Sequence, residues 1–74
     1  MENKLKAIFS QSLGISEELV TDNLRYATIP QWDSVAHMVL VAAIEEGFDV
    51  MLDTEDVIDL SNFQKAKEIV QKYL

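Results

Sequence analysis

Residues 31–49 read QWDSVAHMVLVAAIEEGFD, and the apolar run inside this segment restricts how the whole chain can fold. Between residues 35 and 44 only His37 interrupts the apolar side chains, a pattern that fits either a buried strand or a buried helix. The length of the run, its alanines and the two glutamates after it favour a helix, with Asp33 as its N-cap and Gly47 as its end. A small bundle cannot enclose a helix on every side, so part of this apolar surface is expected to be free for contacts outside the fold.

Amphipathic segments on both sides predict two further long helices. Apolar residues recur at three- and four-residue spacing over about 2–14, where Gly14 supplies a C-terminal stop, and again over about 62–73. Ser61 followed by Gln64 has the spacing of a capping box, which would begin the last helix.

The connection over residues 15–33 is predicted to be a docked loop. It shows no long period, and Ser16 is positioned to cap a single turn over residues 17–19. It also contains apolar side chains that a free linker would not need: Ile15, Leu19, Val20, Leu24, Tyr26, Ile29 and Trp32.

A short helix is predicted before the last long one. Residues 48–52 fit an extended loop, and Asp53 or Thr54 then caps a brief helix that reaches Leu60. The sequence therefore predicts an all-α fold: a small four-helix bundle with three longer helices, a short third helix and a long docked loop between the first two. Residues 1–74 would form one domain, because a chain of this length has room for one modest core.

The composition excludes several classes of function. Thirteen acidic against 6 basic side chains give a formal charge of -7, so nucleic acid would be repelled and basic protein surfaces attracted. Without cysteine the chain forms neither disulfides nor thiolate metal sites, and its acidic clusters have no readable metal-ligand geometry. Neither a signal peptide nor a membrane-spanning run is visible, so we expect a cytoplasmic monomer that does not insert into membranes.

The residues around Ser34 resemble the acyl carrier protein family, which also includes aminoacyl and peptidyl carrier domains. The resemblance covers the whole chain and consists of a long loop, an Asp-Ser pair that opens an apolar second helix, Ile-Glu-Glu-Gly-Phe-Asp over residues 44–49, and the acidic segment 53–56 before a short third helix. An Asp-Ser pair alone is weak evidence. In this spacing, with this length and charge, it is specific.

The resemblance implies a carrier protein and not an enzyme, with no catalytic residues of its own. Ser34 would receive a covalent 4'-phosphopantetheine arm whose thiol holds acyl or aminoacyl groups as thioesters, with Asp33 and His37 beside the arm. The implied partners are a phosphopantetheinyl transferase, a ligase that loads the acyl or aminoacyl group, and downstream biosynthetic enzymes. These partners would meet the second helix at apolar Val35, Met38 and Ala42 and at acidic Glu45 and Glu46.

The residue chemistry agrees with this implication. A chain without cysteine cannot form a thioester itself, so the thiol must be brought in on an arm. Ser34 falls in the first turn of the predicted helix, where unpaired N–H groups and the helix dipole favour a phosphate anion by about 0.3–1 kcal/mol.

The second helix departs from the fatty-acid carriers in one respect. Where these carriers tend to have acidic residues early in the helix, this chain has Ala36, His37 and Val39. Since docking is partly determined by charge, we expect a specialised pathway rather than ordinary fatty-acid synthesis.

Two other functions remain open from the residues alone. One is an acidic helical protein-interaction module that never receives a cofactor. The other is a small serine hydrolase in which Ser34 acts as the nucleophile and His37 as its base, although so small a domain has little room for an oxyanion hole and a dry pocket.

Overall fold

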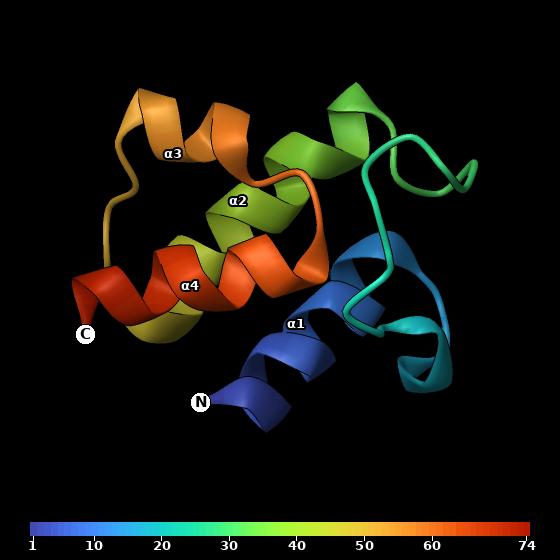
Figure 1. The fold of residues 1–74 in the computed structure, drawn as a ribbon, viewed down its shortest axis with the longest axis horizontal. Helices are drawn as coiled ribbons and strands as arrows, with labels where there is room; N and C mark the ends of the chain where they lie inside the picture. The colour runs from blue at the N-terminus through green and yellow to red at the C-terminus, as the bar shows by residue number, and fades with distance from the viewer.

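Five helical segments make up the structure, a computed structural model that describes residues 1–74 (Figure 1). They are α1 (Glu2–Leu13), the 3-10 turn η1 (Glu17–Leu19), α2 (Ser34–Phe48), α3 (Thr54–Asp59) and α4 (Phe63–Tyr73). In Figure 1 the long connection between α1 and α2 covers one end of the molecule, and the short α3 crosses beside α2 and α4. The predicted all-α four-helix architecture, with a long loop between the first two long helices, is therefore confirmed. None of the helices has the length and apolar character needed to cross a membrane.

The boundaries of α1 and η1 follow from local signals in the sequence. Gly14 takes the left-handed conformation, with φ 67°, and so ends α1 where predicted. The Oγ of Ser16 accepts a hydrogen bond from the Glu18 N–H at 3.2 Å and begins the single turn of η1. Both predictions from the sequence are confirmed.

The end of α2 differs from the prediction. Gly47 lies inside the helix, which continues to Phe48 and ends at Asp49 in the left-handed conformation, with φ 55°. Gly47 is explained by packing instead, because a Cβ at this position would lie 2.7 Å from the Cδ1 of Ile8 on α1. The glycine thus permits a close approach of two helices.

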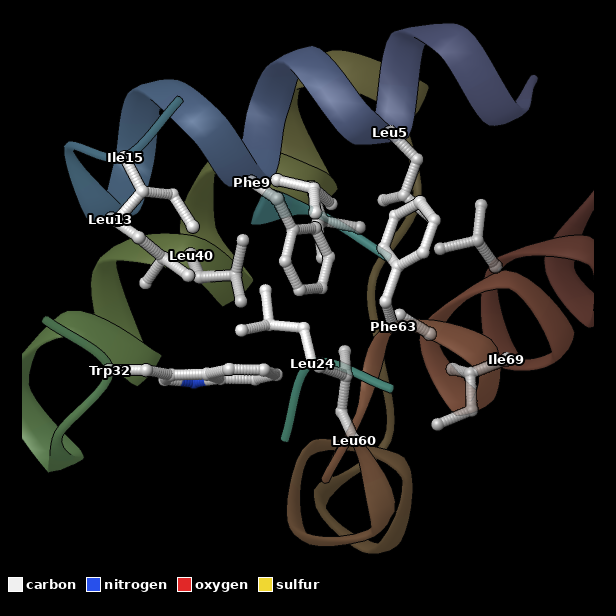
Figure 2. Packing of buried hydrophobic residues seen from close by; sticks show 14 residues of the cluster. Leu5, Phe9, Leu13, Ile15, Leu24, Trp32, Leu40, Leu60, Phe63 and Ile69 are labelled. Carbon is white, nitrogen blue, oxygen red and sulfur yellow. The ribbon is translucent and has the colours of Figure 1, made fainter. Parts of the chain in front are cut away.

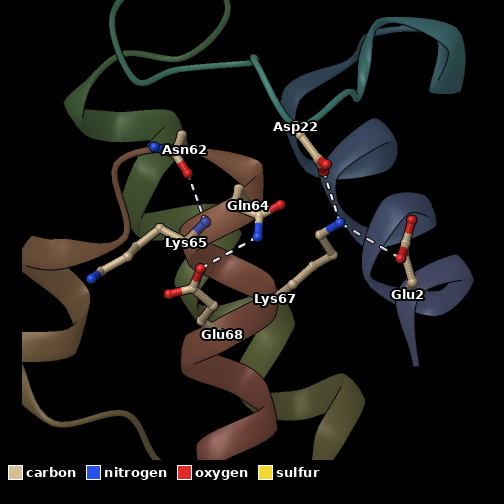
Figure 3. Close-up of polar contacts among 7 residues, drawn as sticks. All are labelled: Glu2, Asp22, Asn62, Gln64, Lys65, Lys67 and Glu68. Atoms are coloured by element: carbon tan, nitrogen blue, oxygen red, sulfur yellow. Dashed lines mark hydrogen bonds and ion pairs between the residues drawn. The ribbon is translucent and has the colours of Figure 1, made fainter.

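The end of α3 and the start of α4 also differ from the prediction. The brief third helix begins after Asp53 as predicted, but it ends at Asp59, so that Leu60 follows it rather than belonging to it. The N-cap of α4 is Asn62, whose Oδ1 accepts from the Lys65 N–H at 2.6 Å (Figure 3). The predicted capping box from Ser61 to Gln64 is wrong.

Aromatic rings at the centre of the core bring distant segments together (Figure 2). The Phe9 ring makes edge-to-face contacts with Trp32 at 5.4 Å and with Phe63 at 5.0 Å between ring centroids. These contacts join α1, the long loop and α4 in one core. Phe48, predicted to lie in the extended loop after α2, is the last residue of that helix and packs half-buried against this core.

The long connection is docked, as predicted. Four of its apolar side chains are buried and Ile29 packs half-buried against the core, whereas Leu19 and Tyr26 are exposed. The main chain of the loop is also paired with the start of α4: the Tyr26 N–H donates to the Ser61 carbonyl at 2.8 Å, and the Phe63 N–H donates to the Leu24 carbonyl at 3.1 Å. These two bonds hold the loop against the bundle.

An ion pair adds a further attachment of the loop to α4 (Figure 3). The Nζ of Lys67 lies 2.7 Å from the Asp22 carboxylate and 3.6 Å from that of Glu2 on α1. The hydrogen bond to Asp22 raises the pKa of Lys67 above its ordinary value. Lys67 therefore stays charged throughout the physiological range.

A buried carboxylate attaches α3 to α4. Asp56 is 7% exposed and accepts hydrogen bonds from the Lys72 Nζ at 2.7 Å and from the Tyr73 hydroxyl. The Tyr73 oxygen in turn accepts from the Asp53 N–H at 3.0 Å. The bonds from Lys72 and then Tyr73 hold the pKa of Asp56 below its ordinary value.

This attachment predicts a defined response to acid. Because the folded pKa of Asp56 is lowered, its contribution is complete above the unfolded carboxyl value of about 3.9 and is lost as pH falls through the folded value. We expect Asp56→Asn to lower the free energy of unfolding at neutral pH, and the difference from the unaltered protein to shrink below pH of about 4. Urea denaturation across pH measures it. Asp59→Asn, an exposed carboxylate on the same helix, is the control, and a penalty for Asp56→Asn that does not change with pH would contradict the prediction.

Candidate functional site

Ser34 is the first residue of α2, and its side chain is exposed. The preceding Asp33 caps the helix: its Oδ1 accepts from the Ala36 N–H at 2.8 Å, and its carbonyl accepts from the His37 N–H at 2.8 Å. The first N–H groups of the helix, at Ser34 and Val35, have no intrahelical acceptor and point out of its end. Ser34 therefore lies at the positive end of the helix dipole, within reach of a modifying enzyme.

A hollow of about 380 Å³ lies directly beside Ser34. It is formed by the loop before α2, by α2 and α3, and by the residues that follow α3. Most of its wall is apolar, and its lining residues are Tyr26, Ser34, His37, Met38, Val57, Ile58, Leu60 and Ser61. Met38 is the one methionine in this lining.

His37 shares a surface with Ser34, but its ring is bound to other groups. Its Nδ1 accepts a hydrogen bond from the Trp32 Nε1–H at 3.0 Å, and its Nε2 lies 2.9 Å from the Val57 carbonyl oxygen. Since Nδ1 accepts, the ring proton is on Nε2 and is donated to Val57. Both nitrogens are thus engaged within the protein.

This tautomer bears on the hydrolase hypothesis. A general base must offer a free lone pair to the hydroxyl that it activates. The lone pair of His37 is directed at Trp32, and the N–H on the other side at Val57. The arrangement does not form a nucleophile and base pair with Ser34.

The exposed apolar face of α2 contains the residues expected to contact partners. Val35 is 73% and Met38 59% exposed, and Ala42 is also exposed. Val39, predicted from the sequence only as an uncharged position, is 51% exposed and belongs to the same face. Its i, i+4 spacing from Val35 was the available signal. Ile58 on α3 extends the exposed apolar surface.

The two glutamates of α2 have different surroundings. Glu46 is exposed, whereas Glu45 is half-buried and its Oε2 accepts from the Leu52 N–H at 2.9 Å. Glu45 thereby holds the loop between α2 and α3, a role that the sequence pattern did not indicate. No group of three or more His, Asp or Glu side chains is arranged to hold a metal ion.

Comparison with known proteins identifies the family. No family model matches the chain. A protein of Buchnera aphidicola subsp. Baizongia pistaciae named acyl carrier protein is 30% identical over 74 residues, which is 100% of this chain and 95% of the relative. Another of that name from Cyanidium caldarium is 34% identical over 67 residues, covering 90% and 78% of the two chains. The chain belongs to the acyl carrier protein family.

A solved structure agrees with this assignment at the level of the fold. The solution NMR structure of a holo acyl carrier protein from Geobacter metallireducens superimposes with a TM-score of 0.84. It covers 97% of this chain and 83% of the other, at 24% sequence identity.

The N-terminal end of α2 fits the phosphopantetheine arm that is typical of acyl carrier proteins. Attachment requires an exposed hydroxyl, and Ser34 has one. The phosphate requires N–H donors and a favourable dipole, which the first turn of the helix supplies. The arm needs open space next to the hydroxyl, and the hollow lined by Ser34 and Met38 provides it.

The N-cap at Asp33 is expected to contribute to the stability of this acyl carrier protein. Asp33→Ala removes the acceptor of the Ala36 N–H, and loss of an N-cap typically costs about 1 kcal/mol. Asp33→Asn retains an oxygen at the same place and is expected to lose much less. Urea denaturation of both variants measures the difference. Equal losses would mean that the negative charge, and not the cap, is what stabilises the helix.

Proposed function

We propose that Ser34 is the residue of this chain that carries 4'-phosphopantetheine. The observation that supports the proposal is the exposed hydroxyl at the first position of α2, capped by Asp33 and open to the hollow. When bound, the group supplies a thiol on which acyl groups are held as thioesters. The chain therefore acts as a carrier protein, and this role matches its family membership.

The residues around Ser34 have distinct tasks in this role. Asp33 fixes the start of the helix, so the hydroxyl has one position relative to the bundle. The N–H groups of the first turn stabilise the phosphate negative charge. His37 shapes the wall of the hollow beside the attachment point rather than taking part in proton transfer.

The partners of the carrier are a phosphopantetheinyl transferase, a ligase that loads an acyl or aminoacyl group, and downstream biosynthetic enzymes. We expect them to meet the chain in the cytoplasm. The exposed face of Val35, Met38 and Ala42 supplies apolar contact area, and Glu46 supplies negative charge for a basic partner surface. Glu45 contributes less to docking, because its carboxylate is bonded to the Leu52 N–H.

The uncharged first half of α2 supports a specialised pathway. Ala36 is half-buried, while Val39 is exposed where a fatty-acid carrier tends to present a carboxylate. A partner selected for this surface must offer an apolar area against Val39 and place its basic groups near Glu46. Such a surface discriminates against partners that need an acidic helix start.

The attachment site is tested by mass spectrometry of the intact protein. After co-expression with a broad-specificity phosphopantetheinyl transferase, we expect one cofactor-sized mass increment that is absent in Ser34→Ala. Ser61→Ala is the matched control, because Ser61 is also exposed and lines the same hollow. If the mass stays unchanged in the presence of active transferase, the chain is an interaction module without a cofactor.

The docking face is tested by the rate of that modification. Met38→Glu places a charge in the apolar face. Burial of the methionine side chain against the docked transferase would contribute about 1.5–3 kcal/mol, so its loss is expected to lower kcat/KM of the transferase by about tenfold or more. Leu19→Glu is the control, because Leu19 is 56% exposed on η1 and lies outside the face. Equal rates for the two variants would contradict docking through α2.

A further inference from the structure

Trp32, His37 and Val57 form a chain of hydrogen bonds that we call the Trp–His strap. The indole N–H donates to Nδ1 of His37 at 3.0 Å, and Nε2 of the same ring lies 2.9 Å from the Val57 carbonyl oxygen. The strap therefore connects the loop before α2, α2 itself and α3. Its bond from His37 to Val57 joins α2 to α3 at the wall of the hollow, which both residues line.

The strap lies between the hollow and the core. His37 lines the hollow, whereas Trp32 is fully buried and stacks behind it, with ring centroids 6.1 Å apart and an interplanar angle of 21°. The ring of the exposed Tyr26 also contacts His37 edge to face, with ring centroids 5.3 Å apart. Figure 2 shows the indole extending from the start of α2 toward Leu24 and Leu60. The inner wall of the hollow is thus closed by packed rings and by the fully buried Leu60.

Opening this wall would be unfavourable for two reasons. An alkyl chain that entered between α2 and α3 would separate His37 from the Val57 carbonyl and leave polar groups without partners in apolar surroundings. It would also displace closely packed rings from the core. Outside the strap, the hollow of about 380 Å³ is at the small end of the range for ligand pockets.

We infer that the Trp–His strap limits the length of the cargo that this carrier shelters. Acyl groups carried on Ser34 are short or polar and remain in the hollow or in solvent, while long alkyl chains do not enter the bundle. The inference rests on the proposed attachment at Ser34, because only a group held there lies next to the hollow. His37 and Trp32 are thereby specificity-determining residues that act through the shape of the wall.

The absence of cysteine allows a test that needs no transferase. In a Ser34→Cys variant the single thiolate attacks an alkyl methanethiosulfonate, forming a mixed disulfide as methanesulfinate leaves. Methyl, butyl, octyl and dodecyl groups are attached in this way. The readouts are Tm and nuclear Overhauser contacts from the terminal methyl group of each chain.

With the strap intact, we expect Tm to stay level from butyl to dodecyl and the terminal methyl to show no contact with Leu40 or Phe9. Adding His37→Ala opens the wall, and Tm is then expected to rise with chain length by about 4 °C or more. Ile58→Ala is the matched control: Ile58 lines the hollow and is 73% exposed but takes no part in the strap, so Tm should stay level.

Contacts from an octyl or dodecyl methyl group to Leu40 or Phe9 in the protein with the strap intact would overturn the inference. That measurement decides the question even where the His37→Ala variant does not fold. Failure of the transferase to modify Ser34 is a separate result: it contradicts the proposed function and leaves the answer about the bundle interior unchanged.

Discussion

Burial of the Trp32 indole determines where Ser34 lies. Trp32 is fully buried and meets Phe9 of α1 edge to face at 5.4 Å, so the chain just before α2 is fixed to the core. Asp33 follows in an extended conformation and turns its carboxylate back onto the Ala36 N–H. The next side chain must then point outward from the first turn. A core contact thus presents a hydroxyl at the surface in a fixed position, as a modification site requires.

The long connection between α1 and α2 can be irregular because it is bound at several points. A segment of this length without regular structure normally counts against a fold assignment. Here buried side chains hold it from inside, and its backbone pairs with the start of α4 through Tyr26 with Ser61 and Leu24 with Phe63. The pairing extends the backbone at Asn62, which leaves this residue, and not Ser61, in position to cap α4.

What could be predicted from the sequence is what depends on neighbouring residues. Gly14 as a helix stop and Asp33 as a cap need only the local backbone, and the position of Ser34 followed from them. The predictions were wrong or incomplete where the role of a residue depends on an element distant in the sequence. Gly47 leaves space for the Ile8 side chain of α1. No local sequence pattern distinguishes a glycine required by helix packing from a glycine that ends a helix. At the site, the bonds of His37 to Trp32 and Val57 depend on α3 lying beside α2, which spacing along the chain does not reveal.

The position of α3 decides the shape of the site, and two separate attachments maintain it. A helix of six residues is not stable alone in water, so it depends on its contacts. Asp56 binds Lys72 and Tyr73 of α4 and does not line the hollow. The next residue, Val57, lines the hollow, and its carbonyl oxygen lies 2.9 Å from the Nε2 of His37. Because the two are distinct, the wall of the hollow can change through His37 while Asp56 still holds α3 against the bundle. Specificity for cargo and stability of the fold thus depend on different residues of one short helix.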